Sequence, residues 1–369
     1  MRIGAHLTVA LSLVSWACSK PSTPEGAGGV LVSSGGRSTA DGGGAEGGRP
    51  PVGGSHESGG GGPGASGGAL PKPEPRYHPP SGFEDCTHAE VTADCEGGWC
   101  KLPPSCFVMG SSEDEWQRGK STENQVAVTL THRLEVQEKE LTRAEWESLT
   151  QMPPPGPDNC TDPNCPVAMV SWWDAVHAAN LLSTRESLPA CYEPVGCTGT
   201  LGKDLECTGV QETAAKVYEC EGYRLPTRAE AEYAAKAGTI STFYSGDITP
   251  FQDTTVCNPD PALDLIGWYC GNSGGKAHSG GELQSNGFGL YDLIGNLGEW
   301  NNDQQHFSSS VGGENPGGEV ERGSERFRFS PQYDDYNFIA RTANLLSGPW
   351  NTRGIRTGFR LVRTLDPNP

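Results

Sequence analysis

The sequence predicts a disulfide-rich α+β domain with little regular secondary structure. Three stretches open with a hydroxyl residue followed three positions later by an acid, the pattern of a helix N-terminus. Short apolar runs around them indicate strands. The stretch 239–357 is rich in Gly, Asn, Asp and Ser, so we expect disulfides or a bound metal to hold this irregular chain together.

The first element is an export signal, predicted for residues 1–18. Arg2 gives a short positive start, and residues 7–17 are apolar but too few to span a bilayer. Ala17 before Cys18 resembles the cleavage site of a bacterial lipoprotein. The sequence therefore predicts lipid on Cys18, which would anchor the protein in the membrane. An ordinary secretory peptide cut nearby is the alternative.

A flexible tether is predicted next, over residues 19–80. Gly, Pro, Ser and Ala dominate it, and it holds few apolar side chains that could offset the entropy of ordering. A chain of this length reaches roughly 40–45 Å. A cysteine-rich segment at 81–105 follows, and the main globular domain is predicted for 106–363.

Twelve of the thirteen cysteines remain when Cys18 is set aside. An even number in an exported chain predicts up to six disulfides. Structural zinc is the alternative, disfavoured because paired CxxC repeats are missing. Connectivity stays open, and the sequence-local candidates are Cys160–Cys165, Cys207–Cys220 and Cys257–Cys270.

The helices are predicted at 142–150, 171–183 and 227–238. Their N-terminal pairs are Thr142 with Glu145, Ser171 with Asp174, and Thr227 with Glu230, and Gly238 is a plausible C-terminal stop. Strands are predicted at 126–130, 267–270 and 359–362.

Charge and motifs exclude several classes of function. Lys and Arg number 27 against 46 Asp and Glu, a formal charge of −19, which opposes nucleic-acid binding and adsorption to anionic lipid. The histidines show neither HxH nor HxxxH spacing, and no GxSxG elbow occurs. His177 fits a structural role in its helix, while His278 and His306 lie in loops that could approach one another.

Six segments, taken in order, resemble one family: "FVMGSS" (107–112), "LTRAEW" (141–146), "PVAMVSWWDA" (166–175), "YRLPTRAEAEYAAKAG" (223–238), "NGFGLYDLIGNLGEW" (286–300) and "GFRLV" (358–362). They look like the successive motifs of the formylglycine-generating enzyme, or sulfatase-modifying factor, domain. The resemblance implies a C-type-lectin-like fold with many loops. Enzymatic members oxidise a sulfatase cysteine to formylglycine with O2 and a copper ion held by two cysteine thiolates.

The sequence departs from the enzymes where copper would bind. The two family cysteines lie between an "RGGSW"-like motif and the terminal "GFR". Here the nearest match is Arg322-Gly323-Ser324, and the last cysteine is Cys270. Because copper(I) prefers thiolates, copper is not expected. Ala231 and Gly298 also replace two tryptophans of the family motifs.

Calcium is the cofactor that the resemblance does imply. Carried over by position, Asp292 and Glu299 would offer side-chain oxygens, and Gly295 and Leu297 backbone oxygens. The alternative is that Asp292 and Glu299 are solvated or paired with arginines such as Arg224 or Arg360. A second family calcium site, somewhere in 257–290, cannot be aligned.

The segment 330–360 corresponds to the family's substrate groove and is rich in residues suited to ligand contacts. The candidates are Tyr333, Tyr336, Asn344, Trp350 and Arg353; the alternative is that these are ordinary loop and core residues. We therefore expect an exported, lipid-anchored, non-catalytic protein that binds a protein, peptide or glycan. A formylglycine-generating oxidase with a divergent site is the alternative, and a structural envelope component is the third possibility.

Overall fold

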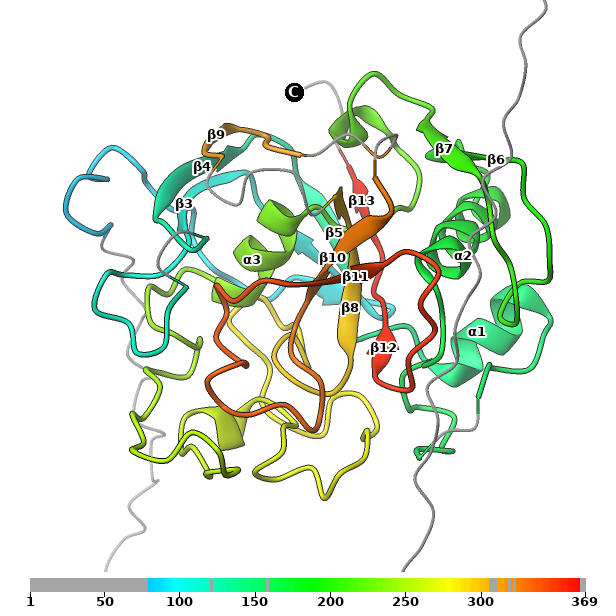
Figure 1. Ribbon diagram of the computed structural model, residues 1–369. Coiled ribbons are helices and arrows are strands. Elements are labelled where there is room, and N and C mark those ends of the chain that lie inside the picture. Colours follow the sequence, from blue (N-terminus) through cyan, green and yellow to red (C-terminus); the bar gives the residue numbers. More distant parts are fainter. Residues whose placement is uncertain are drawn as a thin grey trace, which may run out of the picture. The chain divides into compact units, whose positions relative to one another are not determined.

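The computed structural model describes residues 79–119, 122–156, 159–304, 311–317, 320 and 323–365 (Figure 1). They belong to one compact unit of the chain, residues 70–369. The predicted signal peptide with Cys18, and all but the last two residues of the predicted tether, lie outside the described residues, as do His306 and Arg322.

Three α-helices form where the hydroxyl–acid pairs predict them. They are α1 (Arg143–Thr150), α2 (Trp172–Arg185) and α3 (Arg228–Lys236). In each, the hydroxyl accepts from the third helical N–H while the acid accepts from the N-cap N–H, which satisfies two otherwise unpaired donors. Helix α3 ends with Ala237 and Gly238 both at positive φ; the C-cap is Ala237, one residue before the predicted Gly238.

Short strands form three sheets and one hairpin. The first sheet has the order β1-β2-β5-β13, the second β11-β10-β8-β12 and the third β3-β4-β9, while β6 and β7 pair with each other. Their bounds are β1 Cys95–Glu96, β2 Trp99–Leu102, β3 Ser105–Met109, β4 Val126–Leu130, β5 Leu134–Gln137, β6 Tyr192–Val195, β7 Gly209–Glu212, β8 Gly298–Gln304, β9 Gly313–Glu314, β10 Glu325–Phe329, β11 Leu346–Pro349, β12 Thr357–Gly358 and β13 Val362–Thr364. The cysteine-rich segment 81–105 thus supplies β1 and β2 to the first sheet.

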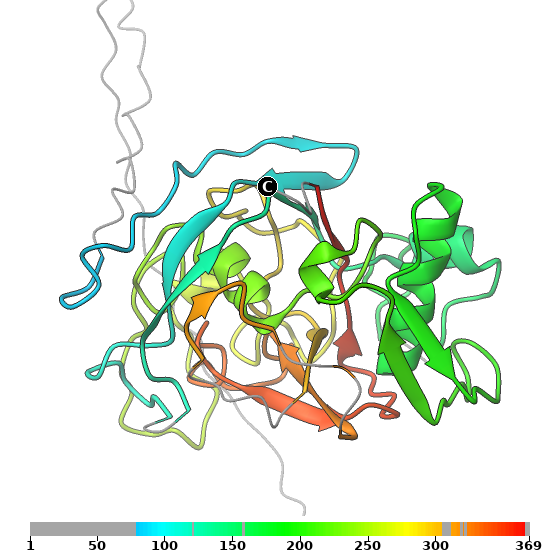
Figure 2. The ribbon, with the colours of Figure 1, turned by 90° about the horizontal axis from the view of Figure 1, so that it is seen from above.

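Two apolar cores lie on either side of the second sheet. Helices α1 and α2 and the β6–β7 hairpin gather on one side of the domain, and the β3–β4–β9 sheet lies on the other, in both views (Figures 1 and 2). One core forms around Tyr233 of α3, and the other around Trp172 of α2. The family motifs contribute directly to these cores: Phe107, Tyr233 and Phe288 belong to the first, and Trp146, Trp172 and Phe359 to the second.

The strand predictions succeed only in part. The strand at 126–130 is confirmed as β4, but the predicted strand at 359–362 overlaps β13 only at Val362. The predicted strand at 267–270 is wrong, because these residues are irregular. Their backbone groups form hydrogen bonds with loop residues instead: the carbonyl of Trp268 accepts from the backbone N–H of Asn296, and the N–H of Tyr269 donates to Asn272 Oδ1.

Twelve cysteines form six disulfides, which confirms the predicted number. Cys160–Cys165 and Cys257–Cys270 are confirmed, whereas Cys207–Cys220 is wrong. Pairing of Thr198 with Glu206 places Cys197 opposite Cys207 at the tip of the β6–β7 hairpin, so these two join and Cys220 pairs with Cys191. The remaining pairs are Cys86–Cys106 and Cys95–Cys100.

Six disulfides are typical of a protein that folds in an oxidising compartment, which supports an exported protein. Within the described residues, no helix combines the length and the apolar character needed to cross a bilayer.

Candidate functional site

The loop before β8 carries the predicted calcium ligands and turns tightly around Gly295. Asp292 and Asn296 take positive φ angles of 54° and 61°, and Gly295 has φ 94°. A Cβ at Gly295 would lie 2.3 Å from the carbonyl oxygen of Trp268, so only glycine fits there. The turn brings Asp292, Gly295, Leu297 and Glu299 together on one short segment.

Three carboxylates and one guanidinium form a buried group at this loop, here called the carboxylate cluster: Glu140, Asp292, Glu299 and Arg360. Each is at most 2% exposed. Glu140 precedes the LTRAEW motif and accepts from the backbone N–H of Leu297 at 2.9 Å and from the amide of Asn296 at 2.7 Å. The cluster joins the middle of the chain to its C-terminal motif.

Glu299 is held by Arg360. The guanidinium donates from Nε to both carboxylate oxygens, at 2.9 and 2.8 Å, and from Nη2 to Oε1 at 2.7 Å. The alternative that Glu299 pairs with an arginine is therefore confirmed. The backbone oxygen of Gly295 accepts from the hydroxyl of Ser330 at 3.0 Å. Since carboxylate and carbonyl oxygens have more than one lone pair, these contacts leave both able to bind a cation.

Asp292 is the unsatisfied member of the cluster. Its Oδ2 accepts from the N–H of Gly281 at 2.7 Å, but Oδ1 is buried and has no hydrogen-bond partner among the described residues. Burial, together with the charge of Glu299, raises the pKa of Asp292 to about 6. Burial and the two neighbouring acids raise the pKa of Glu140 as well.

The charges of the cluster do not balance. Three acids face Arg360, and the other cation that acts on Asp292 is Lys139, which is only half-buried. A buried carboxylate oxygen without a donor and an excess of negative charge both suit a hard cation with oxygen ligands. The residues present therefore fit calcium.

The predicted ligand residues of the C-terminal segment do not gather at one place. Trp350 and Arg353 lie together against the start of α2. The ring of Trp350 is 4.7 Å from that of Trp173, and Nε of Arg353 is 3.0 Å from Oδ2 of the buried Asp174. Both side chains thus stabilise the packing of the segment on α2.

The other three predicted residues occupy separate positions. Tyr333 is only 2% exposed, and its hydroxyl accepts from the amide of Asn159 at 2.9 Å. Asn344 donates to the carbonyl of Ile339 at 2.8 Å. Tyr336 is 37% exposed and stacks on Phe338, with centroids 5.5 Å apart. Of the five, Tyr336 presents the most surface to a partner.

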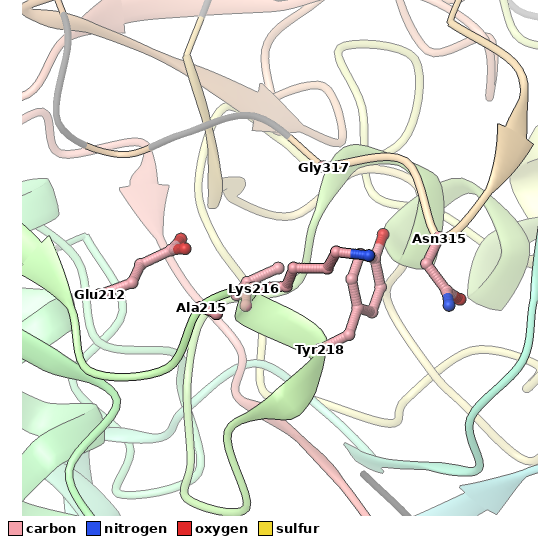
Figure 3. A pocket seen from close by; sticks show the side chains of 7 residues that line it. Glu212, Ala215, Lys216, Tyr218, Asn315 and Gly317 are labelled. Atoms are coloured by element: carbon pink, nitrogen blue, oxygen red, sulfur yellow. The ribbon is translucent and has the colours of Figure 1, made fainter. Parts of the chain in front are cut away.

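Hollows of about 240 to 310 Å³ open at three places lined by described residues. Figure 3 shows one of about 240 Å³, in which Lys216 and Tyr218 lie between Glu212 and Asn315. One of its lining residues, Gly317, is the last described residue of the segment 311–317, and we assign the hollow no ligand. A second, of about 310 Å³, lies between Trp99 and α1. The third, of about 250 Å³, contains Trp116, and sequence reasoning missed it entirely.

Among the described residues, one group of three histidine, cysteine or acid side chains brings its ligand atoms within 4.8 Å of one another: His177, Cys197 and Cys207. The two sulfurs are joined in a disulfide, so they are not thiolate ligands. His177 binds the carbonyl of Trp173 through Nδ1 at 2.9 Å, in agreement with the structural role expected for it. The three acids of the carboxylate cluster do not form such a group, so calcium there would need backbone oxygens as well.

The family described as Sulfatase-modifying factor enzyme 1-like domain matches residues 102–365. The chain belongs to this family. The match begins at Leu102, the last residue of β2, and ends at residue 365, the last described residue. It therefore covers the carboxylate cluster and both apolar cores except Cys100.

Two relatives align with parts of the chain. A protein named Chaperone protein LppX, from Paenibacillus barcinonensis, is 28% identical over 204 residues, which cover 50% of this chain and 67% of the relative. The formylglycine-generating enzyme of Mycobacterium tuberculosis is 38% identical over 88 residues, 21% of this chain and 26% of that enzyme.

Solved structures share the fold of this sulfatase-modifying factor domain. Treponema denticola variable protein 1 has a TM-score of 0.55 at 23% identity and covers 72% of this chain and 94% of its own. PvdO from Pseudomonas aeruginosa has the same TM-score at 20% identity, covering 74% and 98%. The predicted α+β fold of this family is thereby confirmed.

Proposed function

We propose that this member of the sulfatase-modifying factor family is an exported, lipid-anchored protein that binds a partner and does not oxidise sulfatase cysteines. One observation carries the proposal: the twelve cysteines from Cys86 to Cys270 all lie in disulfides, and no cysteine follows Cys270. Copper(I) chemistry in this family depends on two free thiolates, and the donor set present does not fit it. We derive no catalytic step through copper.

The relative named as a chaperone supports partner binding, since it aligns with half of this chain. The partner would be a protein, peptide or glycan. The alternative, an oxidase with a divergent site, is favoured by the 38% identity to a formylglycine-generating enzyme, although that match spans about a quarter of the enzyme.

A peptide assay separates the two functions. We expect no aldehyde when the purified chain is incubated with a CxPxR peptide, copper(I), O2 and a reductant too weak to open its disulfides, with product read by mass spectrometry. A copper-loaded formylglycine-generating enzyme is the positive control. In parallel, iodoacetamide under denaturing conditions should label none of the twelve cysteines before reduction and all twelve after it. Turnover of the peptide would overturn the proposal.

We also propose that Cys18 carries the lipid and that residues 19–80 tether the domain to the membrane. The support is the sequence pattern around Ala17 and Cys18. The wild-type chain, expressed in bacteria, should partition into the detergent phase of a Triton X-114 separation, and Cys18→Ser should move to the aqueous phase. Aqueous partition of the wild type would support the ordinary secretory peptide instead.

Calcium is the cofactor that we propose for the carboxylate cluster. Asp292 and Glu299 would contribute carboxylate oxygens, and Gly295 and Leu297 backbone oxygens. Bound calcium would neutralise part of the buried negative charge and fix the loop before β8. The free Oδ1 of Asp292 supports this assignment, and the Discussion gives its test.

A further inference from the structure

The pocket at Trp116 is formed by two segments that are distant in the sequence. One follows β3 and includes Asp114, Glu115 and Trp116; the other is the loop after α3, with Ile240 and Asp247. The pocket has a volume of about 250 Å³. It shares no lining residue with the carboxylate cluster or the predicted ligand residues, and of the family motifs quoted above only FVMGSS reaches it, through Ser112.

Aromatic side chains continue from the pocket along the surface. Trp116 makes edge contacts with Phe251 and Phe338, with ring centroids 6.4 and 6.2 Å apart. Phe338 in turn stacks on the exposed Tyr336. Ile240, at the pocket itself, is 55% exposed. This part of the surface therefore offers apolar area that no other described element covers.

The charged groups that line the pocket are all acidic. They are Asp114, Glu115 and Asp247, and the described residues add no lysine or arginine to the lining. Glu115 has Arg341 as its ion-pair partner, with Nη1 to Oε1 at 2.9 Å. The same Nη1 lies 2.6 Å from Glu123 Oε2, so this single guanidinium is shared between two acids. The pocket keeps a negative charge that its own residues do not neutralise.

We propose that the pocket at Trp116 binds a cationic side chain, lysine or arginine, of a partner protein. An indole beside carboxylates is a favourable environment for an organic cation, because the ring attracts the charge and the acids accept its hydrogen bonds. The aromatic row from Trp116 to Tyr336 would contact the residues that flank the cation. This proposal specifies the chemistry of the partner, and it rests on the partner-binding function proposed above.

The exposed acids contribute without being needed for the fold. Asp114 is fully exposed, with a side-chain hydrogen bond to Ser112 that lowers its pKa. Asp247 is exposed too, and its Oδ1 accepts from the N–H of Thr242 at 3.2 Å, a contact that an asparagine can keep. Both can be neutralised while Glu115, Glu123 and Arg341 stay intact.

The test is a titration of the full-length chain with amides of Nα-acetyl-arginine and Nα-acetyl-lysine, followed by the NMR signal of the Trp116 indole. Citrulline and norleucine amides are the uncharged counterparts. We expect saturable shifts with at least one cationic amide, and weak or no shifts with the uncharged ones. Comparing the affinities of the arginine and lysine amides identifies the preferred cation. Binding should weaken as salt is added.

The variant Asp114→Asn/Asp247→Asn should weaken cation binding roughly tenfold or more, since each nearby charge contributes about fivefold. Asp162→Asn is the matched control: Asp162 is exposed, accepts a backbone N–H two residues ahead, and does not line the pocket. Equal binding of charged and uncharged amides, or unchanged affinity in the double variant, would overturn the proposal. Either result would leave the copper argument untouched, whereas peptide oxidation would overturn that argument alone.

Discussion

Replacement of Arg360 by leucine lowers the free energy of unfolding by about 3–5 kcal/mol, as measured by urea denaturation with disulfides intact and chelator present. Arg360 and Glu299 are each 2% exposed and share three hydrogen bonds of 2.7–2.9 Å. Loss of the guanidinium leaves Glu299 buried beside two further acids, Glu140 and Asp292. The cost therefore comes mainly from unpaired buried charge and less from the lost contact itself.

Two further variants separate this cause from a simple loss of packing. Arg363→Leu removes a pair of similar length, Nε to Glu135 Oε2 at 2.6 Å, but its side chains are 25% and 12% exposed. It should cost about 1 kcal/mol or less. Glu299→Gln/Arg360→Leu should recover part of the stability, because the unpaired charge is removed with the arginine. Equal losses in the two single variants, or no recovery in the double one, would contradict this explanation.

Local signals in the sequence predict the helices well. A hydroxyl and an acid three positions apart interact directly across the first turn, so the capping box depends on no distant residue. Each of the three predicted helix starts is confirmed within one residue. The strand at 267–270 fails for the opposite reason: a strand needs a neighbour, and the backbone of Trp268 instead bonds to the loop at Asn296.

The prediction of the disulfides is limited in the same way, because pairing depends on residues distant in the sequence. The sequence gives their number, since oxidised cysteines in an exported domain pair. It does not say which cysteines meet. Cys207 joins Cys197 and not Cys220 because the β6–β7 hairpin folds the chain back on itself, a feature of strand pairing that cysteine spacing does not encode.

The sequence predicts the candidate sites only where their residues share one motif. Asp292 and Glu299 lie on one motif and could be carried over by position. Glu140 lies more than 150 residues away and joins them only in the folded domain, through its bonds to Asn296 and Leu297. Trp116 and Ile240 of the pocket lie more than 120 residues apart, and the one motif residue that lines it, Ser112, does not by itself indicate a pocket.

Calcium should raise the melting temperature of the chain at pH 7 and lose this effect by pH 5. The sign follows from Asp292, whose pKa burial raises to about 6 from an ordinary 3.8. A raised acid pKa means that, without metal, the folded state holds its proton longer than the unfolded state. Stability from this group is therefore full below about pH 4 and declines as pH rises through 6. Calcium requires the charged carboxylate, so its stabilisation grows over the same interval.

The variant Asp292→Asn distinguishes a metal ligand from a buried acid with an unfavourable charge. Asparagine can keep the bond from Gly281 while removing the charge. In chelator at pH 7, the variant should be more stable than the wild type, by up to about 3 kcal/mol for a shift of two pKa units. In calcium at 100 times the dissociation constant, the wild type should gain about 2.7 kcal/mol and the variant little. Asp162→Asn should follow the wild type in both conditions.

A calcium-induced rise in stability that persists in Asp292→Asn, or that is as large at pH 5 as at pH 7, would place the ion elsewhere. A variant less stable than the wild type in chelator would mean that the charged carboxylate stabilises the fold without any metal.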